Sequence, residues 1–172
     1  PEVSIGNLIV SEGDNGLHTV SVDVTRSGIN PGDLIMPASV DFQSIDGTAT
    51  VSAGDYQVIS GTINFGSEAT SLTQTETITF QISGDTRVEF DETFNIKLSN
   101  LTGYAQLTQS MSTITIRDDD QATLSIDDVT VNEAAGTAIL TVSLDKPVDT
   151  TVTVDFSTIN QSATASDDYL NQ

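Results

Sequence analysis

Three consecutive acidic residues, Asp118-Asp119-Asp120, form the stretch of this sequence whose chemistry is easiest to specify. Neighbouring carboxylates repel one another by about 3 kcal/mol per close pair at an effective dielectric constant near 20. The chain has 25 Asp and Glu residues but only 5 Lys and Arg residues, so its own side chains supply little neutralising charge. A hard divalent cation held by oxygen ligands, in particular Ca²⁺, would supply it. The alternative is a solvated acidic turn between two copies of a repeat.

Composition excludes several classes of function. The net charge of −20 argues against nucleic acid and anionic membranes as partners, because both would be repelled. There is no cysteine, which excludes disulfides, thiolate metal sites and cysteine nucleophiles. A single histidine and the absence of tryptophan leave few residues for a catalytic triad or a sugar-stacking platform, so we predict that the chain is not an enzyme. No apolar run is long enough to predict membrane insertion.

The elements that must position the acids are short strands. Apolar and polar residues alternate in several segments, and turns rich in Gly, Asp and Asn separate these segments. Residues 25–28 are predicted to begin one of the loops. The pattern predicts an all-β fold, an antiparallel immunoglobulin-like β-sandwich of about seven strands within residues 1–120. The clearest inward-facing sets are Val20, Val22 and Val24; Ile78, Phe80 and Ile82; Phe94, Ile96 and Leu98; and Ile114 with Ile116.

The same pattern begins again after Asp120. Leu124-Ser125-Ile126 repeats Val3-Ser4-Ile5, and Asp168-Tyr169 repeats Asp55-Tyr56. We therefore expect a complete domain at residues 1–120 and the first half of a second copy at 121–172, in a segment of a longer protein. Half a sandwich cannot bury both of its faces. We expect it to be poorly supported, or to be completed by strand pairing with a neighbouring chain.

Six ordered motifs give the first copy a family resemblance. They are Val10-Ser11-Glu12-Gly13, Asp46-Gly47-Thr48-Ala49, Gly54-Asp55-Tyr56, Gly61-Thr62-Ile63-Asn64-Phe65, Glu89-Phe90-Asp91-Glu92-Thr93-Phe94 and Ile114-Thr115-Ile116-Arg117-Asp118-Asp119-Asp120. Together they resemble a Calx-beta domain, the calcium-sensing module of sodium–calcium exchangers that also occurs in tandem in surface proteins. The resemblance covers residues 1–120 and the first half of a second domain in 121–172.

The resemblance implies that acids from separated loops hold Ca²⁺ at one end of the sandwich. Carried over motif by motif, the metal ligands are Glu12, Asp55, Asp85, Glu89, Glu92, Asp118, Asp119 and Asp120, with the backbone carbonyl of Arg87. Calcium-binding members with the fullest sites have consecutive acids where this chain has Gly84 and Asp85, so we expect about one to three ions. No EF-hand pattern is present. The second copy keeps only Glu133, Asp167 and Asp168, and we expect it to hold no ion.

These observations favour a calcium-binding module of a multi-repeat surface or secreted protein, extracellular or at the cell surface. Calcium would stiffen the loop end and the inter-domain junction, for adhesion or structural spacing. Its expected partners are calcium ions, neighbouring repeats, and a protein or glycan ligand. One alternative is a cytosolic calcium sensor that regulates a transporter. The other is a structural or carbohydrate-binding sandwich in which the acids confer only solubility.

Overall fold

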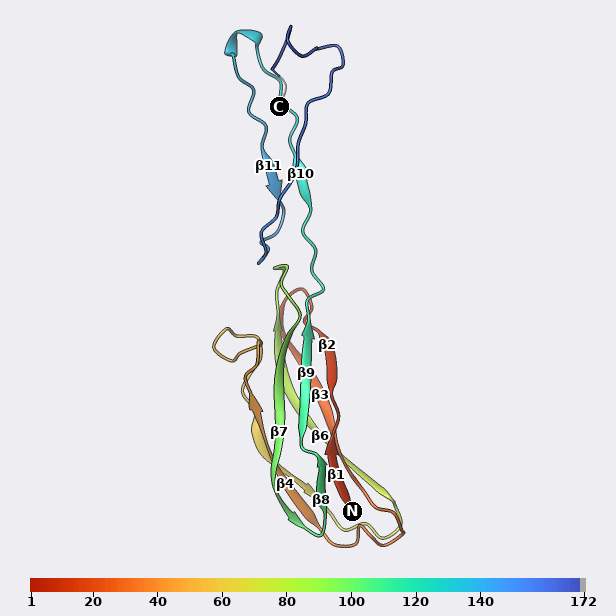
Figure 1. Ribbon diagram of the computed structural model, residues 1–172. Helices are drawn as coiled ribbons and strands as arrows, with labels where there is room; N and C mark the ends of the chain where they lie inside the picture. Colours follow the sequence, from red (N-terminus) through yellow and green to blue (C-terminus); the bar gives the residue numbers. More distant parts are fainter. Residues whose placement is uncertain (171–172) are drawn as a thin grey trace.

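The computed structural model describes residues 1–170, so the last two residues of the expected second repeat lie outside the described residues. Residues 1–117 fold as two facing β-sheets, which confirms the predicted all-β sandwich (Figure 1). One sheet has the strand order β6-β3-β1-β8 and the other β2-β9-β7-β4-β5. The strands are β1 Glu2–Ile5, β2 Leu8–Ser11, β3 Gly16–Ser27, β4 Ala38–Ile45, β5 Ser60–Phe65, β6 Thr73–Gly84, β7 Glu92–Gly103, β8 Gln106–Gln109 and β9 Met111–Arg117.

The first and last strands of the sandwich are each divided in two, which accounts for the difference from the seven strands expected. The chain leaves β1 at the Gly6-Asn7 break and enters the opposite sheet as β2, while β8 and β9 do the same on either side of Ser110. Ser112 Oγ donates to Gly6 O at 2.5 Å, and this hydrogen bond ties the two crossings together. The β1–β8 and β2–β9 pairs are parallel and the other pairs are antiparallel. Because β2 and β9 run in the same direction, both deliver their following acids to one end.

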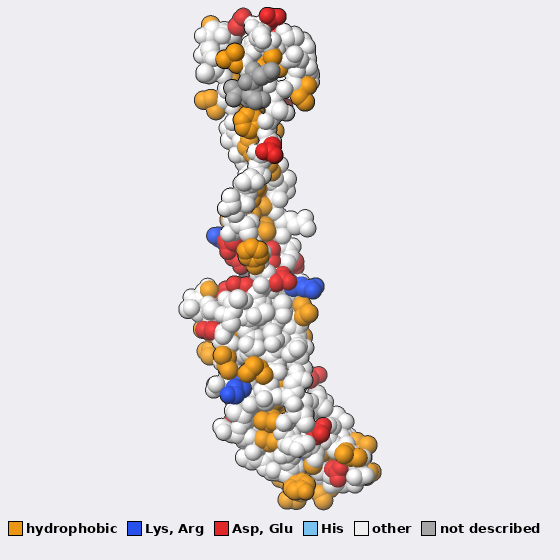
Figure 2. Space-filling view, in the orientation of Figure 1, with side chains coloured by type: hydrophobic (Ala, Val, Ile, Leu, Met, Phe, Trp, Pro, Cys, Tyr) orange, Lys and Arg blue, Asp and Glu red, His pale blue; other side chains and the backbone are white. Residues whose placement is uncertain are grey.

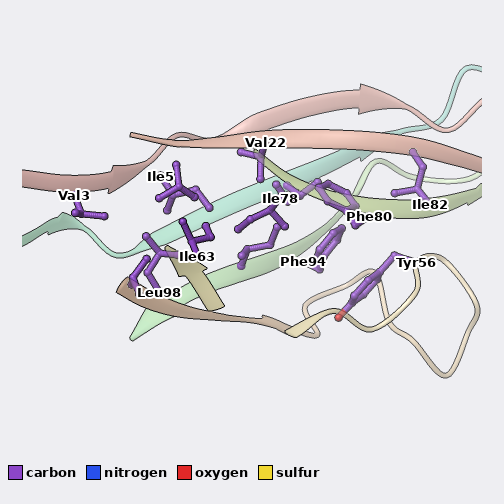
Figure 3. Packing of buried hydrophobic residues seen from close by; sticks show 14 of the residues in the cluster. Val3, Ile5, Val22, Tyr56, Ile63, Ile78, Phe80, Ile82, Phe94 and Leu98 are labelled. Atoms are coloured by element: carbon purple, nitrogen blue, oxygen red, sulfur yellow. The ribbon is translucent and has the colours of Figure 1, made fainter. Parts of the chain in front are cut away.

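The core lies between the sheets and is built from the alternating residues (Figure 3). Tyr56 and Phe94 stack with their ring centroids 3.8 Å apart, and Phe80 meets Phe94 edge-on at 5.6 Å. The Tyr56 hydroxyl donates to Asp46 Oδ1 at 2.6 Å. This buried ring therefore anchors the loop that carries Asp55.

The prediction that a loop begins at residues 25–28 is wrong, because β3 continues to Ser27. Arg26 is fully buried, and its guanidinium donates to Met36 O at 2.6 Å and to Gln74 Oε1 at 3.2 Å. Burial lowers the pKa of Arg26. Neutral acceptors hold the two terminal nitrogens of this buried cation, while its Nε has no hydrogen-bond partner. The inward-facing Arg26 is therefore part of the strand where the sequence pattern indicated a turn.

Residues 121–170 form a thinner extension beyond the sandwich (Figure 1). It contains β10 Leu124–Ile126, paired antiparallel with β11 Val142–Leu144, and the 3₁₀ turn η1 Glu133–Ala135. The segment around Phe156 forms no strand, and Phe156 is 73% exposed. None of the described helical segments has the length and apolar character needed to cross a membrane.

One turn of the first repeat recurs in the second. Tyr169 donates from its hydroxyl to Asn160 Oδ1 at 2.6 Å, as Tyr56 does to Asp46. Thr164 N donates to Asp168 Oδ2 at 2.8 Å, and the same bond joins Thr50 N to Asp55 at 2.7 Å. The local hydrogen bonds of this turn therefore form without a closed sandwich around them.

Candidate metal centre

The acids meet where the strands β2, β6 and β9 end or continue into loops. Ser11 of β2 lies opposite Arg117 of β9, and Glu12 N donates to Arg117 O at 3.0 Å. This parallel pairing carries Glu12 and the acid run to the same end of the sandwich. The loop from β6 to β7 brings Asp85 to that end as well. Figure 2 shows the resulting concentration of acidic side chains at the waist between the sandwich and the extension.

Three carboxylates form the tightest group. Glu12, Asp85 and Asp120 each offer an oxygen, and these oxygens lie within 4.8 Å of one another. Glu12 is only 8% exposed and Asp120 only 7%, while Asp85 is exposed. Glu12 Oε1 and Asp120 Oδ2 are buried and have no hydrogen-bond partner. Buried, unpaired carboxylate oxygens are costly, and a cation between them would remove that cost.

The electrostatics of Glu12 show how closely the other acids approach it. Burial, followed by the negative charges of Glu89, Asp118 and Asp85, raises the pKa of Glu12 to about 8. A hydrogen bond between the Glu12 and Asp118 side chains also contributes to this raised pKa. Calcium would favour the ionised form that these neighbours disfavour.

A second group of acids lies beside the first. Burial raises the pKa of Glu92 to about 7, with further contributions from the charge of Asp55 and a hydrogen bond with it. The pKa of Glu89 is raised by burial and then by Asp149 and Asp85. Since Glu89 raises the pKa of both Glu12 and Glu92, it links the two groups into one acidic centre.

Asp119 and Arg87 have defined contacts at the edge of this centre. Asp119 Oδ1 accepts a hydrogen bond from Gly13 N at 3.1 Å and so braces the turn that follows Glu12. Arg87 N donates to Asp85 Oδ1 at 2.6 Å, and the guanidinium lies 3.4 Å from Glu89. The Arg87 side chain thus serves as a counter-ion, and the ligand role of its carbonyl oxygen stays a prediction.

Two residues of the second repeat complete the centre, and the sequence analysis did not identify either. Lys146 Nζ lies 2.8 Å from Asp120 Oδ1, and Asp149 pairs with the Arg87 guanidinium. Backbone hydrogen bonds join the two repeats at the same place, from Val88 N to Pro147 O and from Asp149 N to Val88 O, each at 3.0 Å. The available signal was the very short linker after Asp120, because it keeps the second repeat close to the acids.

The donor set fits calcium among the common metals. It consists of carboxylate oxygens from separated loops, and no cysteine is available to favour a softer metal. The structure therefore brings Glu12, Asp85, Asp118 and Asp120 together, and places Asp55, Glu89 and Glu92 in the adjoining group. Glu133 and Asp168 of the second repeat are exposed and are not members of the carboxylate group found in the described residues.

Comparison with known proteins gives a consistent result. The family model of the Calx-beta domain matches residues 6–120 and again residues 121–172. The solved structure of CBD12 from CALX1.2 is 27% identical with a TM-score of 0.57, over 70% of this chain and 46% of that one. The apo-form Calx CBD1 domain is 28% identical with a TM-score of 0.55, over 69% of this chain and 97% of that one. The Calx CBD2 domain, at 13% identity and a TM-score of 0.53, shares the fold. No curated protein matches the chain.

Proposed function

The chain belongs to the Calx-beta domain family, and we propose that it is a calcium-binding module, without enzymatic activity, whose ions sit at the junction of two repeats. The observation that carries this proposal is the convergence of Glu12, Asp85 and Asp120, in which two buried carboxylate oxygens have no partner. A solvated acidic turn would not bury these atoms. A relative at 29% identity is described as a calcium binding domain, which supports the same assignment.

The two groups of acids suggest how the ions would be shared. Glu12, Asp85, Asp118 and Asp120 would hold one ion, while Asp55, Glu89 and Glu92 would hold another beside it. Asp119 and the Arg87 carbonyl are the remaining candidate ligands. When bound, calcium supplies positive charge to a centre whose acids otherwise repel one another.

The position of the centre suggests a mechanical role. Residues 146–149 of the second repeat already lie against the loop that carries Asp85 and Glu89. Calcium at the tip would stiffen this junction, which suits a module for adhesion or structural spacing in a multi-repeat protein that is extracellular or at the cell surface. Its partners would be neighbouring repeats and a protein or glycan ligand. Two tandem family segments support this context.

A cytosolic sensor that regulates a transporter is the second candidate. The resemblance to the calcium-sensing module of sodium–calcium exchangers favours it, and a similar structure at 29% identity is described as a calcium binding domain of CALX1.1. The sequence on either side of this segment in the full-length protein separates the two: further repeats support the surface module, and flanking membrane-spanning helices support the sensor.

Strand pairing through the second repeat forms a further part of this proposal. Leu124 and Ile126 of β10 are 41% and 59% exposed, whereas Val3 and Ile5 at the corresponding positions of the first repeat are fully buried. We propose that strands from a second copy of this chain cover the exposed side. Light scattering should then show a dimer at high protein concentration, and a monomer at every concentration would exclude this pairing.

Thermal unfolding tests the calcium proposal itself. An ion that binds only the folded state stabilises it by about 2.7 kcal/mol at a hundredfold excess over Kd. The melting temperature should therefore be higher in millimolar calcium than in chelator, and magnesium should have a smaller effect. Equal melting temperatures in chelator and in calcium would support the alternative in which the acids confer only solubility.

A further inference from the structure

We propose that Lys146 of the second repeat is a built-in competitor of calcium: its ammonium group neutralises Asp120 in the metal-free protein and leaves Asp120 when an ion binds. This inference rests on the proposed calcium binding. It assigns to one lysine of the second repeat the role of setting the calcium affinity of the site.

The geometry makes the competition direct. Lys146 Nζ lies 2.8 Å from Asp120 Oδ1, within the range of a charge-assisted hydrogen bond. The Asp120 side chain has no exposed surface, so it cannot gain a water shell in exchange for the lysine. Its other oxygen, Oδ2, has no partner, and Asp120 belongs to the tight group with Glu12 and Asp85. The ammonium group and a metal ion would therefore compete for binding to the Asp120 carboxylate.

The surroundings of Lys146 keep its ammonium group charged, and they allow the side chain to move from Asp120 into solvent. The hydrogen bond to Asp120, followed by the charges of Asp120, Asp14 and Asp145, raises the pKa of Lys146. Its side chain is 31% exposed, so the flexible stem reaches solvent without any movement of the backbone. The negative charges of Asp14 and Asp145 would still attract the ammonium group after it leaves Asp120.

The segment that carries Lys146 does not depend on the lysine for its position. Val88 N donates to Pro147 O and Asp149 N donates to Val88 O, and Arg87 pairs with Asp149. These contacts hold residues 146–149 against the first repeat independently of the pair between Lys146 and Asp120. In Figure 2, basic side chains are visible on both edges of the acidic waist. Removal of the Lys146 charge should therefore change the metal site and leave the docking in place.

A substitution at Lys146 gives the sharpest test. Lys146→Gln removes both the competing hydrogen bond and a positive charge that repels calcium, so its calcium Kd should fall about tenfold, on the scale of one charge-assisted hydrogen bond. Lys97→Gln is the matched control, since Lys97 is exposed on β7 and the change in net charge is identical. Its Kd should equal that of the wild type. Both are measured by calorimetric titration of the whole chain.

The outcomes separate this inference from the proposed function. If the wild type binds no calcium, the proposed function fails. If the wild type binds and Lys146→Gln has the same Kd as Lys97→Gln, calcium binding stands and the competition is wrong. A Kd that rises in Lys146→Gln also overturns it, because Lys146 would then support the site.

A second readout does not depend on affinity. The chain has only two lysines, Lys97 and Lys146, so nuclear magnetic resonance of ¹⁵N-labelled protein can follow each ammonium group, and the Lys97→Gln variant assigns them. The Lys146 resonance should move on addition of calcium while that of Lys97 stays in place. A Lys146 resonance that does not move in protein saturated with calcium would overturn the proposal.

Discussion

Glu12 is the residue on which the proposed site depends most. It is an acid buried among other acids: burial, followed by the negative charges of Glu89, Asp118 and Asp85, raises the pKa of Glu12 to about 8. Its Oε1 atom has no hydrogen-bond partner. Such a residue destabilises the metal-free fold when ionised and becomes favourable only with a cation beside it. Removal of the Glu12 charge should therefore stabilise the metal-free protein but weaken its calcium binding.

Glu12→Gln should therefore stabilise the metal-free protein and weaken its response to calcium. In chelator we expect a gain of about 1 kcal/mol, or roughly 3 °C in melting temperature for a chain of this length. In calcium the Kd should rise at least about tenfold, because a carboxylate ligand is lost. Glu76→Gln, an exposed position on β6, removes the same charge and should change neither quantity. Loss of stability in chelator for Glu12→Gln would contradict this account.

The pH dependence of stability should change sign with calcium. Without metal, the pKa of Glu12 is about 8 and that of Glu92 about 7, against an ordinary value of 4.5 for both. Between these values the folded state binds more protons than the unfolded state, so stability should fall as the pH rises from about 5 to about 8. With saturating calcium the ligands must be ionised, and stability should rise over the same range. Melting temperatures in metal-free and calcium-containing buffers at several pH values provide the measurement. Parallel profiles would contradict the prediction.

At the scale of elements, the end of β6 lies too close to the Glu12 turn for a side chain at position 84. A Cβ atom placed on Gly84 would lie 2.0 Å from Gly13 O and 2.3 Å from Glu12 O, because β6 passes directly against the turn that holds Glu12. An acid cannot occupy this position without moving that turn. Asp85 is the first position after β6 that can present a carboxylate without this clash.

Gly84→Ala should separate β6 from the Glu12 turn. We expect a loss of about 2 kcal/mol in unfolding free energy, as in other overpacked sites, together with weaker calcium binding. Gly66→Ala is the control, since its added Cβ would meet nothing within 4 Å. Chemical denaturation of both variants in chelator checks the prediction. Equal stability of the two variants would show that the turn can shift freely.

The sequence predicted the elements better than their contacts. Val22, Val24 and Phe94 alternate with polar residues, and this local pattern was sufficient to place their strands and the core. Arg26 has the inward-facing parity of β3, but its acceptors on Met36 and Gln74 are known only from the fold. The sequence pattern therefore ended β3 too early.

The same distinction applies to the site. Glu12 and Asp120 could be assigned to one end because they follow strands of a recognisable fold. Lys146 and Asp149 could not, since their contacts depend on how the second repeat turns back onto the first. The carboxylates named from the sequence lie together or in adjoining groups, and their roles as ligands stay a prediction.

At the scale of the whole molecule, one repeat is closed and the other is open. The first repeat buries its apolar residues between two sheets, whereas Phe156 and Ile126 of the second remain largely exposed. The acidic centre lies between them and contains groups from both. A cation bound there would act on the junction as well as on the first repeat.

Calorimetric titration of the calcium-free chain with calcium tests the central claim most directly, beside a variant that combines Glu12→Gln with Asp120→Asn. Saturable binding of about one to three ions by the wild type, and binding weakened by at least about tenfold in the double variant, is the predicted result. A wild type that releases no heat of binding, and whose melting temperature calcium leaves unchanged, would contradict the account.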